Sequence, residues 1–386
     1  MVRQRTGVRS WSRMAALAVG LLAACGSSPT GGGTPDDAAA ADAAADAAAA
    51  DRRLAADGPP DGVPGDAGPG DAAAPADAAA DGGAVTRVTV VMASDIAENG
   101  RTQYARAAAA LITGHTPTVT AVVLAGDNAR YDPMTFLTLL EYYTTYYQPA
   151  SEANWGQFDT IAFPQLGNHE DTVLGAQGYF DYFAARMTAI KALPGYGGAI
   201  DDTAKAYYSF DVNGWHFVSL NSNCASVGGG CGAGSAQEAW LKSDLQAHAA
   251  MPLIGVWHAP RYTCGGSHGD ATELQTLWAD LYDARADFVF TGHNHYYERW
   301  KPLNKNDPQA AVDTVNGLTQ IIAGSYGVTT YAACTTLDPR VERALGNDPG
   351  MGVFFLTLGS DGSYSFEYRL LSDGTAFDSG SGQSHH

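Results

Sequence analysis

Five short apolar runs, each ending in polar residues, constrain the fold of this chain most strongly. They read "VTRVTVVMASD", "VTAVVLAGDN", "TIAFPQLGNH", "PLIGVWH" and "DFVFTGHNH", and they lie between Val85 and His295. Runs this short and this rich in β-branched residues are typical of buried strands. Helix-like segments separate several of them. The pattern predicts an α/β (α+β) domain in which a mixed sheet, or a pair of sheets, is flanked by helices.

The pattern also predicts the elements between and after these runs. A hairpin is expected at 206–222, with Asn213 and Gly214 as its two-residue turn, and another at 352–371. Ser235 is a suitable N-cap for a following helix. Helices are predicted at 104–115, 133–147, 178–193, 235–250 and 271–285. The domain is therefore placed at 85–372, and the last residues, 373–386, are expected to form a flexible tail.

The first 84 residues are of a different kind. Four arginines precede an apolar run, 14–24, which is too short to span a bilayer and has the layout of a secretory signal. The run ends in "LAAC" and resembles a bacterial lipobox, in which the signal is cut before Cys25 and this cysteine is acylated. An ordinary export signal with a chance cysteine is the alternative. Residues 1–24 are predicted as a signal peptide of the lipoprotein type. Residues 25–84, mostly Ala, Asp, Gly and Pro, are predicted as a disordered tether.

The charge of the chain argues against nucleic acid as a partner, and its cysteine content indicates an oxidising compartment. The net charge is −19, with eleven aspartates and two arginines in the tether, and no basic face for nucleic acid is visible. Four cysteines remain beyond Cys25, which favours two disulfides in an oxidising compartment. The short, glycine-rich loop between Cys224 and Cys231 favours that pair and leaves Cys264 for Cys334. A zinc site is the alternative, although no C-x-x-C spacing supports it.

The polar residues at the ends of the five runs are metal-ligand types. Gly292 permits a tight turn, so that His293 and His295 can point into one space. Carboxylate and amide oxygens combined with imidazoles suit iron, manganese or zinc. The five ends carry Asp95, Asp127, Asn168 with His169, His258, and His293 with His295. So many ligand types at strand ends indicate a metal site.

These blocks resemble the calcineurin-like metallophosphoesterases, and within them the purple acid phosphatase-like branch. In order, the chain has "SDIA" (94–97), "GDNARY" (126–131), "GNHE" (167–170), "VWHAP" (256–260) and "GHNH" (292–295). The resemblance covers about residues 86–370. It implies a two-sheet β-sandwich flanked by helices, with two metal ions at one edge, one of them iron and the other zinc, manganese or iron.

The resemblance also implies roles for the ligand-type residues. Asp95 and His295 would bind the first metal, and Asp127 would bridge both. Asn168, His258 and His293 would complete the second. The wider family has Asp-x-His in its first block, where this chain has Ala97, and the purple branch supplies a tyrosine three residues after the bridging aspartate. Here Tyr131 follows Asp127 by four residues. Tyr131 is therefore either a metal ligand or a packing residue, and in the second case a water molecule would fill the ligand position.

The implied activity is hydrolysis of phosphate monoesters by attack of a metal-bound hydroxide. His169, oriented by Glu170 or another carboxylate, would stabilise the transition state or protonate the leaving oxygen. His268, ten residues after His258, would contact substrate. Arg261 is a candidate phosphate contact, with surface solvation as the alternative. The expected partner is a small phosphate ester.

Two other functions stay open. The same metal pair serves phosphodiesterases acting on cyclic nucleotides or lipid head groups. A tethered, non-catalytic envelope binding protein is a further alternative, against which the complete ligand set argues. The expected location is the bacterial cell envelope, with membrane contact only through the lipid anchor. Gly26 and Ser27 lack the aspartate that resembles an inner-membrane retention signal, which favours the outer membrane.

Overall fold

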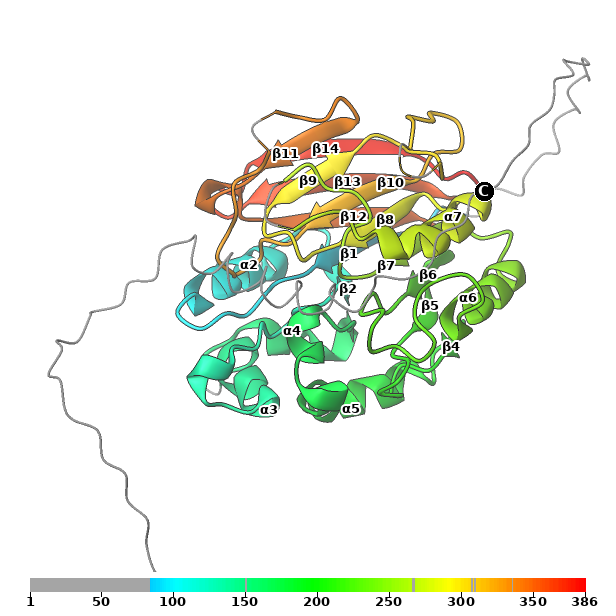
Figure 1. Ribbon diagram of the computed structural model, residues 1–386. Helices are drawn as coiled ribbons and strands as arrows, with labels where there is room; N and C mark the ends of the chain where they lie inside the picture. Colours follow the sequence, from blue (N-terminus) through cyan, green and yellow to red (C-terminus); the bar gives the residue numbers. More distant parts are fainter. Residues whose placement is uncertain (1–83, 150, 266–267, 307, 309, 335) are drawn as a thin grey trace, which may run out of the picture.

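Two β-sheets form the framework of the chain in the computed structural model (Figure 1). The structure describes residues 84–386 except 150, 266–267, 307, 309 and 335. The predicted signal peptide, Cys25 and nearly all of the predicted tether lie outside the described residues. Within the described part, no helix combines the length and apolar character needed to cross a membrane.

The first sheet has six strands in the order β14-β13-β12-β1-β2-β3. β1, β2 and β3 run parallel to one another, whereas β12, β13 and β14 are joined by antiparallel pairing, and β12 pairs antiparallel with β1. The strands are β1 (Arg87–Ala93), β2 (Val119–Leu124), β3 (Ala162–Phe163), β12 (Gly352–Gly359), β13 (Ser363–Leu370) and β14 (Ala376–Gln383).

The second sheet has eight strands in the order β11-β9-β10-β8-β7-β6-β5-β4. Its centre, β6, β7, β8 and β10, is parallel. The strands are β4 (Gly197–Gly198), β5 (Tyr208–Val212), β6 (Trp215–Ser219), β7 (Leu253–Val256), β8 (Phe288–Thr291), β9 (Tyr297–Trp300), β10 (Thr319–Ala323) and β11 (Val341–Leu345). The predicted fold class, with two sheets rather than one, is confirmed.

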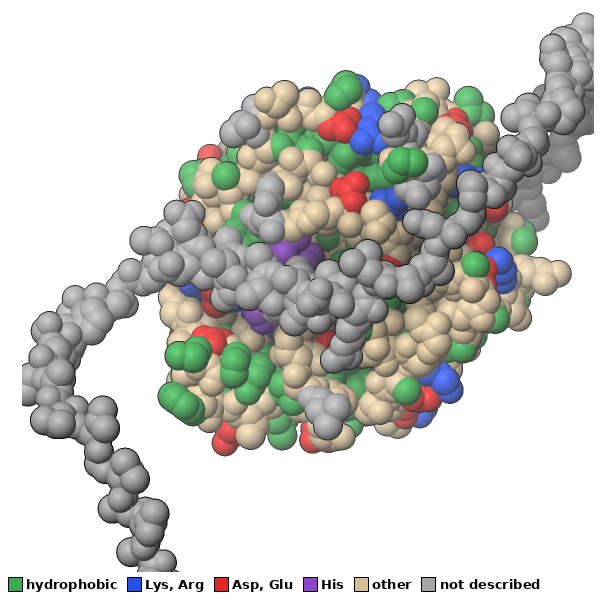
Figure 2. Space-filling model, viewed as in Figure 1, with side chains coloured by type: hydrophobic (Ala, Val, Ile, Leu, Met, Phe, Trp, Pro, Cys, Tyr) green, Lys and Arg blue, Asp and Glu red, His purple; other side chains and the backbone are tan. Residues whose placement is uncertain are grey.

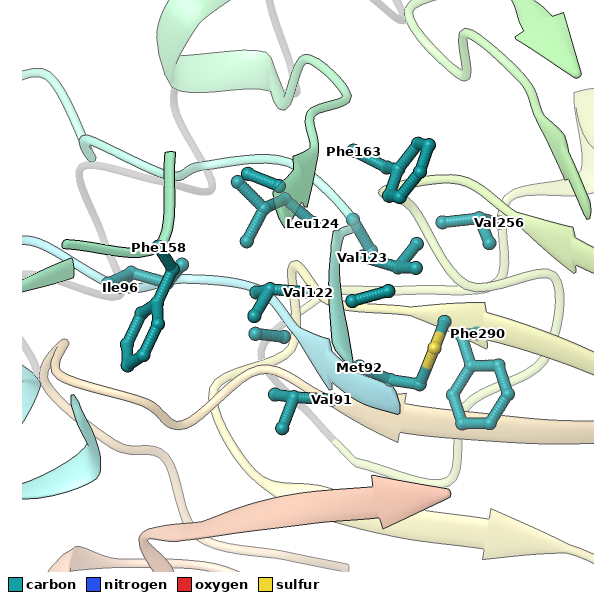
Figure 3. Close-up of a cluster of buried hydrophobic side chains, with 14 of the residues drawn as sticks. Val91, Met92, Ile96, Val122, Val123, Leu124, Phe158, Phe163, Val256 and Phe290 are labelled. Carbon is teal, nitrogen blue, oxygen red and sulfur yellow. The ribbon is translucent and has the colours of Figure 1, made fainter. Parts of the chain in front are cut away.

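The main core lies between the two sheets. Figure 3 shows Val91 and Met92 of β1 and residues 122–124 of β2 in one cluster with Val256 of β7 and Phe290 of β8. All of these side chains are buried. Because burial of each large apolar side chain contributes about 1.5–3 kcal/mol, this layer holds the two sheets together at the place where their strands end.

Helices flank the sheets (Figure 1). α6 and α7 pack together over the second sheet. α3, α4 and α5 form a lobe below α2 in this view, and the buried apolar side chains of α3 and α5 belong to the main core. Ser235 caps α6 as predicted, since its Oγ accepts from the N–H of Glu238 at 3.1 Å. The helices are α2 (Thr102–Thr113), α3 (Leu139–Tyr142), α4 (Asn168–Asp171), α5 (Gln177–Ile190), α6 (Ala236–Ala247) and α7 (Gln275–Asp283).

The single helix predicted at 133–147 is wrong, because the structure divides this segment. A 3₁₀ turn, Pro133–Thr135, ends at Phe136, whose φ is 57°. A new helix then begins after its N-cap Thr138, which forms a capping box with Glu141, and the backbone widens into a π-helical turn at Tyr143–Tyr147. A cap inside the segment starts a new helix in a new direction, so the helical spacing of the sequence did not imply one continuous helix.

The flexible tail predicted at 373–386 is also wrong, because most of it forms β14. β14 pairs with β13 from Ser363↔Gln383 to Arg369↔Ala376. Its glycines fit against aromatic rings: a Cβ on Gly380 would lie 2.7 Å from the Phe366 ring. Asp378 accepts hydrogen bonds from Arg299 and Tyr297 of β9, which fixes the strand across both sheets. The domain therefore includes β14.

Three local predictions are confirmed. Asn213 and Gly214 form the turn between β5 and β6, with φ values of 50° and 83°. Both predicted disulfides, Cys224–Cys231 and Cys264–Cys334, are present. The hairpin predicted at 352–371 is β12–β13.

Candidate metal centre

The ends of β1, β2, β7 and β8 and the start of α4 meet at one edge of the sandwich. The first sheet supplies Asp95 and Asp127, and the second supplies His258, His293 and His295. All five side chains are buried. Figure 2 shows histidine side chains reaching the surface near the middle of the face in view, above the lobe of α3, α4 and α5. Asn168 and His169, at the start of α4, are half-buried, so the edge combines buried ligand types with partly exposed ones.

The backbone is strained at three of these residues. Asp95, Asp127 and His293 have φ values of 56°, 49° and 67°, in the left-handed region that non-glycine residues seldom occupy. Glycine permits the close approach between them, because a Cβ on Gly292 would collide with Ser94 Oγ and with Asp95 Oδ2. Strain of this kind costs about 1–3 kcal/mol per residue and concentrates at functional sites.

Two carboxylates and an imidazole gather at the centre of the site. Asp95, Asp127 and His258 each offer one ligand atom, and these atoms lie within 4.8 Å of one another. Oδ2 of Asp95 accepts from Ser94 Oγ at 2.7 Å and from the N–H of His293 at 2.9 Å. Oδ1 of Asp95 is buried without a hydrogen bond and lies 3.3 Å from His295 Nε2. A buried carboxylate oxygen that accepts no hydrogen bond is suited to bind a cation.

Asn168, the first residue of α4, completes the convergence. Its Oδ1 lies 3.0 Å from His258 Nε2 and 3.0 Å from His293 Nδ1. His258 Nε2 also lies 3.4 Å from Asp127 Oδ2. An amide oxygen, a carboxylate oxygen and two imidazole nitrogens thus face one small volume.

Backbone carbonyls orient two of the imidazoles. His258 Nδ1 donates to the carbonyl of Ala125 at 2.8 Å, and His295 Nδ1 donates to the carbonyl of Thr329 at 2.6 Å. In each ring the nitrogen that faces the carbonyl carries a hydrogen, so Nε2 is the atom turned toward the site and would bind a metal. Histidines that bind metals are generally held in this way.

The electrostatics of the site also favour a cation. Burial by itself would raise the pKa of Asp127, but His258 and His169 hold this pKa far below its usual range. Burial lowers the pKa of His258, whereas Asp127 and Asp95 raise it, and the result is about 10. The site therefore attracts positive charge. With its hard oxygens and borderline nitrogens, the residue set fits iron, manganese or zinc.

Glu170 has a different role from the one predicted. Its fully buried carboxylate accepts four hydrogen bonds, from the N–H groups of Asp127, Ala129 and Gly167 and from Tyr143 OH, at 2.8–3.1 Å. It is therefore occupied by these donors rather than by the His169 ring. Burial, and then the charge of Asp127, raise the pKa of Glu170 to about 7. The sequence signal for this role was its place in "GNHE".

The two predicted substrate histidines lie beside the centre. The N–H of His169 donates to Asp127 Oδ1 at 3.0 Å, and its Nδ1 lies 2.9 Å from the carbonyl of Tyr131. The ring of His268 packs on His293 with centroids 4.0 Å apart. His169 is half-buried, so it is the more accessible of the two.

The side chains of Tyr131 and Arg261 pack against neighbouring aromatic rings. The Tyr131 ring contacts Tyr142 edge-on at 5.9 Å, which matches the packing alternative, and its role as a ligand stays a prediction. The Arg261 side chain is buried, donates from Nε to Gln275 at 2.8 Å and lies 4.4 Å above the Tyr262 ring. These contacts give Arg261 a structural role in the core of the second sheet, and they do not support it as a phosphate contact.

Two further groups of metal-ligand type occur in the described part of the chain. One contains Cys264 and Cys334, which are joined in a disulfide. The other contains Asp211, His216 and His248. Both nitrogens of His216 contact carboxylates, Asp211 at 2.7 Å and Asp244 at 2.8 Å, so this ring bridges the two acids.

Comparison with known proteins agrees with this geometry. The sequence model of the calcineurin-like phosphoesterases matches residues 88–297, more than half of the chain. The chain belongs to the calcineurin-like phosphoesterase family. The matched residues include every predicted metal ligand, from Asp95 to His295, so the family assignment rests on the segment that builds the site.

Among calcineurin-like phosphoesterases, the chain is similar to purple acid phosphatases of Arabidopsis thaliana. It is 34% identical to purple acid phosphatase 23 over 164 residues, which are 40% of this chain and 33% of the relative. It is 39% identical to purple acid phosphatase 21 over 109 residues, 26% of this chain and 24% of the relative. The chain thus spans a third or less of the length of these relatives.

Solved structures share the calcineurin-like fold. The purple acid phosphatase PPD1 from yellow lupin seeds superposes with a TM-score of 0.57 at 17% identity, covering 77% of this chain and 53% of that one. GAP50, the anchor in the inner membrane complex of Plasmodium, superposes with a TM-score of 0.53 at 15% identity, covering 77% and 89%. At these identities the likeness concerns the fold alone.

Proposed function

We propose that this protein hydrolyses phosphate monoesters at a centre of two metal ions. The observation that carries the proposal is the convergence of Asn168 Oδ1 with His258 Nε2 and His293 Nδ1, each 3.0 Å away. These three residues would hold one ion. Asp95 and His295, whose ligand atoms lie 3.3 Å apart, would hold the other.

Asp127 is the residue suited to bridge the two ions. Its Oδ2 faces His258, and its carboxylate belongs to the same group of ligand atoms as that of Asp95. A shared carboxylate offsets the repulsion between two cations in a two-metal centre. Bound metal ions would supply an acidified water and neutralise charge on the phosphoryl oxygens.

The histidines beside the centre act on the substrate. The Tyr131 carbonyl fixes Nδ1 of His169 as a donor, so the proton that His169 gives to the leaving oxygen is carried by Nε2. His268, packed on His293, binds a phosphoryl oxygen or the ester group. The similarity to purple acid phosphatases supports a monoester as the substrate.

The test is metal content and ester hydrolysis on the oxidised full-length protein. Elemental analysis should give about two metal ions per chain, and p-nitrophenyl phosphate should be cleaved faster than bis-p-nitrophenyl phosphate. Asn168→Ala should lose metal and activity, whereas the exposed Asn316→Ala should keep both. A faster diester reaction would identify a phosphodiesterase. Failure to bind iron, zinc or manganese, with no turnover, would leave a non-catalytic binding protein.

We also propose that the protein works outside the cytoplasm on a lipid anchor at Cys25. The lipobox-like "LAAC" and the two disulfides support this, because disulfides persist in oxidising compartments. Membrane fractionation tests it. The intact chain should sediment with outer membranes, and Cys25→Ser should appear in the soluble fraction. Equal distribution of both forms would refute the anchor.

A further inference from the structure

Tyr331, which no motif singles out, stacks on one of the predicted metal ligands. Its ring lies parallel to that of His295, with centroids 4.3 Å apart and planes 13° apart. Tyr331 is buried in the connection between β10 and β11. Its N–H donates to the carbonyl of His295 at 2.9 Å. Thr329, two residues earlier, accepts from His295 Nδ1, so one short segment contacts the backbone, the ring edge and the ring face of His295.

The same ring reaches the predicted substrate histidine. The Tyr331 and His268 centroids lie 5.8 Å apart, and the His268 ring packs on His293 at 4.0 Å. The four side chains, which we call the aromatic clamp, are His268, His293, His295 and Tyr331. Through the aromatic clamp, the position of His268 is coupled to both histidines of the "GHNH" block.

A disulfide ties together the two segments that carry the outer members of the aromatic clamp. Cys264 lies four residues before His268, and its partner Cys334 lies three residues after Tyr331. The N–H of Cys264 also donates to the buried carboxylate of Glu298 in β9, at 3.3 Å. The other disulfide, Cys224–Cys231, closes a short loop after β6, where Cys231 contacts Asn221 and Gln237.

We propose that Tyr331 is a positioning residue for His268 and His295, and that the Cys264–Cys334 disulfide holds the aromatic clamp in its working arrangement. This inference rests on the proposed function, since it assigns the disulfide to substrate binding at that centre. Substrate binding then depends on one disulfide and not on the other. Tyr331 acts through the two histidines and does not itself transfer a proton.

The first arm of the test is independent of activity. In the metal-free, full-length protein with ¹³C-labelled histidine, the Cε1–H signals of His268 and His295 are assigned with His268→Gln and His295→Gln. The parallel Tyr331 ring should shift the His295 signal by its ring current, and Tyr331→Leu should abolish this shift while Tyr331→Phe retains it. Cys264→Ser/Cys334→Ser should move both signals, and Cys224→Ser/Cys231→Ser should move neither.

The second arm measures kcat and KM for p-nitrophenyl phosphate on the same metal-loaded variants, with bound metal counted. Tyr331→Leu and Cys264→Ser/Cys334→Ser should lose about tenfold in kcat/KM, mainly through KM, while retaining metal. Tyr331→Phe should restore at least about half of the wild-type value, and Cys224→Ser/Cys231→Ser should stay within about twofold of it.

Two results would overturn the proposal. One is Tyr331→Leu with unchanged histidine signals and unchanged kcat/KM. The other is an equal response of the two disulfide variants in both arms. If the wild-type protein cleaves no ester, the proposed function fails, and the histidine signals still decide whether the aromatic clamp depends on Tyr331 and on the Cys264–Cys334 disulfide.

Discussion

The backbone N–H of Asp127 donates to Oε2 of Glu170 at 3.0 Å, so a side chain of α4 fixes the loop that follows β2. The same oxygen accepts from the N–H of Gly167, the N-cap of α4. One buried carboxylate therefore joins the two segments that present Asp127 and Asn168 to the centre. Loss of this carboxylate would remove the hydrogen bonds that hold both segments in place.

Glu170→Ala should destabilise the protein strongly. It leaves four buried donors without an acceptor, and each costs about 1–3 kcal/mol, so the free energy of unfolding should fall by at least about 3 kcal/mol. Urea unfolding measures it. Glu152→Ala is the matched control, because Glu152 pairs with Arg106 at the surface, and it should cost less than about 1 kcal/mol. Equal losses in the two variants would contradict the bracing role of Glu170.

Gly292→Ala should damage the site rather than the whole fold. The added Cβ collides with Ser94 Oγ and Asp95 Oδ2, so both side chains must move and the Asp95 carboxylate is displaced. Overpacking of this kind costs about 1–3 kcal/mol. Metal bound per chain, from elemental analysis, should fall, while circular dichroism should stay native. Gly232→Ala meets open space and should bind metal as the wild type does; full metal retention in Gly292→Ala would refute the prediction.

His216 should make stability depend on pH. Burial lowers its pKa, but the hydrogen bonds to Asp244 and Asp211 more than compensate, and the pKa in the folded state is raised above 6.5. The groups around it are these two carboxylates, the His248 ring stacked at 3.7 Å, and Ser209, which donates to Asp244. The stabilisation is fully present below about pH 6.5 and is lost as the pH rises through the raised pKa.

The measurement is urea unfolding of the wild type and His216→Gln at about pH 5.5 and about pH 9.5. The free energy of unfolding of the wild type should exceed that of His216→Gln by a larger amount at the lower pH. A difference that is constant, or larger at the higher pH, would show that His216 does not bridge the carboxylates as a cation.

Asp378→Ala should show that the C-terminal segment is structural. Asp378 accepts from Arg299 at 2.7 and 3.0 Å and from Tyr297 OH at 2.8 Å. Removing one partner of a buried ion pair costs about 3–5 kcal/mol, and we expect about 3 because Arg299 retains some exposure. Thermal or urea unfolding checks it. The exposed Asp373→Ala should cost less than about 1 kcal/mol, and a similarly small cost for Asp378→Ala would return the segment to a dispensable tail.

The sequence predicts well what depends on local spacing. Apolar runs located β1, β2, β7 and β8, and the polar residues directly after them were expected to meet because parallel strands end at a common edge. The structure does bring Asp95, Asp127 and His258 together there. The Asn213–Gly214 turn was predictable for the same reason, since its signal is complete within two residues.

Features that depend on contacts with distant parts of the chain could not be predicted from local spacing. β14 contains "DSGSG", which has little intrinsic strand preference, and it becomes a strand because β13 offers it a ladder and aromatic rings to pack against. In the sequence Glu170 is only the last residue of the "GNHE" block. The four groups that donate hydrogen bonds to it lie in three segments of the chain, which the sequence alone does not bring together. Tyr331 carries no signal, because its proximity to His295 arises only when the connection after β10 folds back.

The pairing of β1 with β12 has a consequence for how the domain is assembled. Arg87 lies opposite Gly359, so the strand that positions Asp95 is completed by a partner that comes much later in the sequence. Such long-range pairing slows folding, because the chain must close a large loop before the contact forms. Until β12 is made, β1 pairs only with β2, and β2 pairs with β3. The centre can therefore reach its final shape only after β12 has left the ribosome, and a chain cut between His295 and β12 would carry every predicted ligand without the strand that pairs with β1.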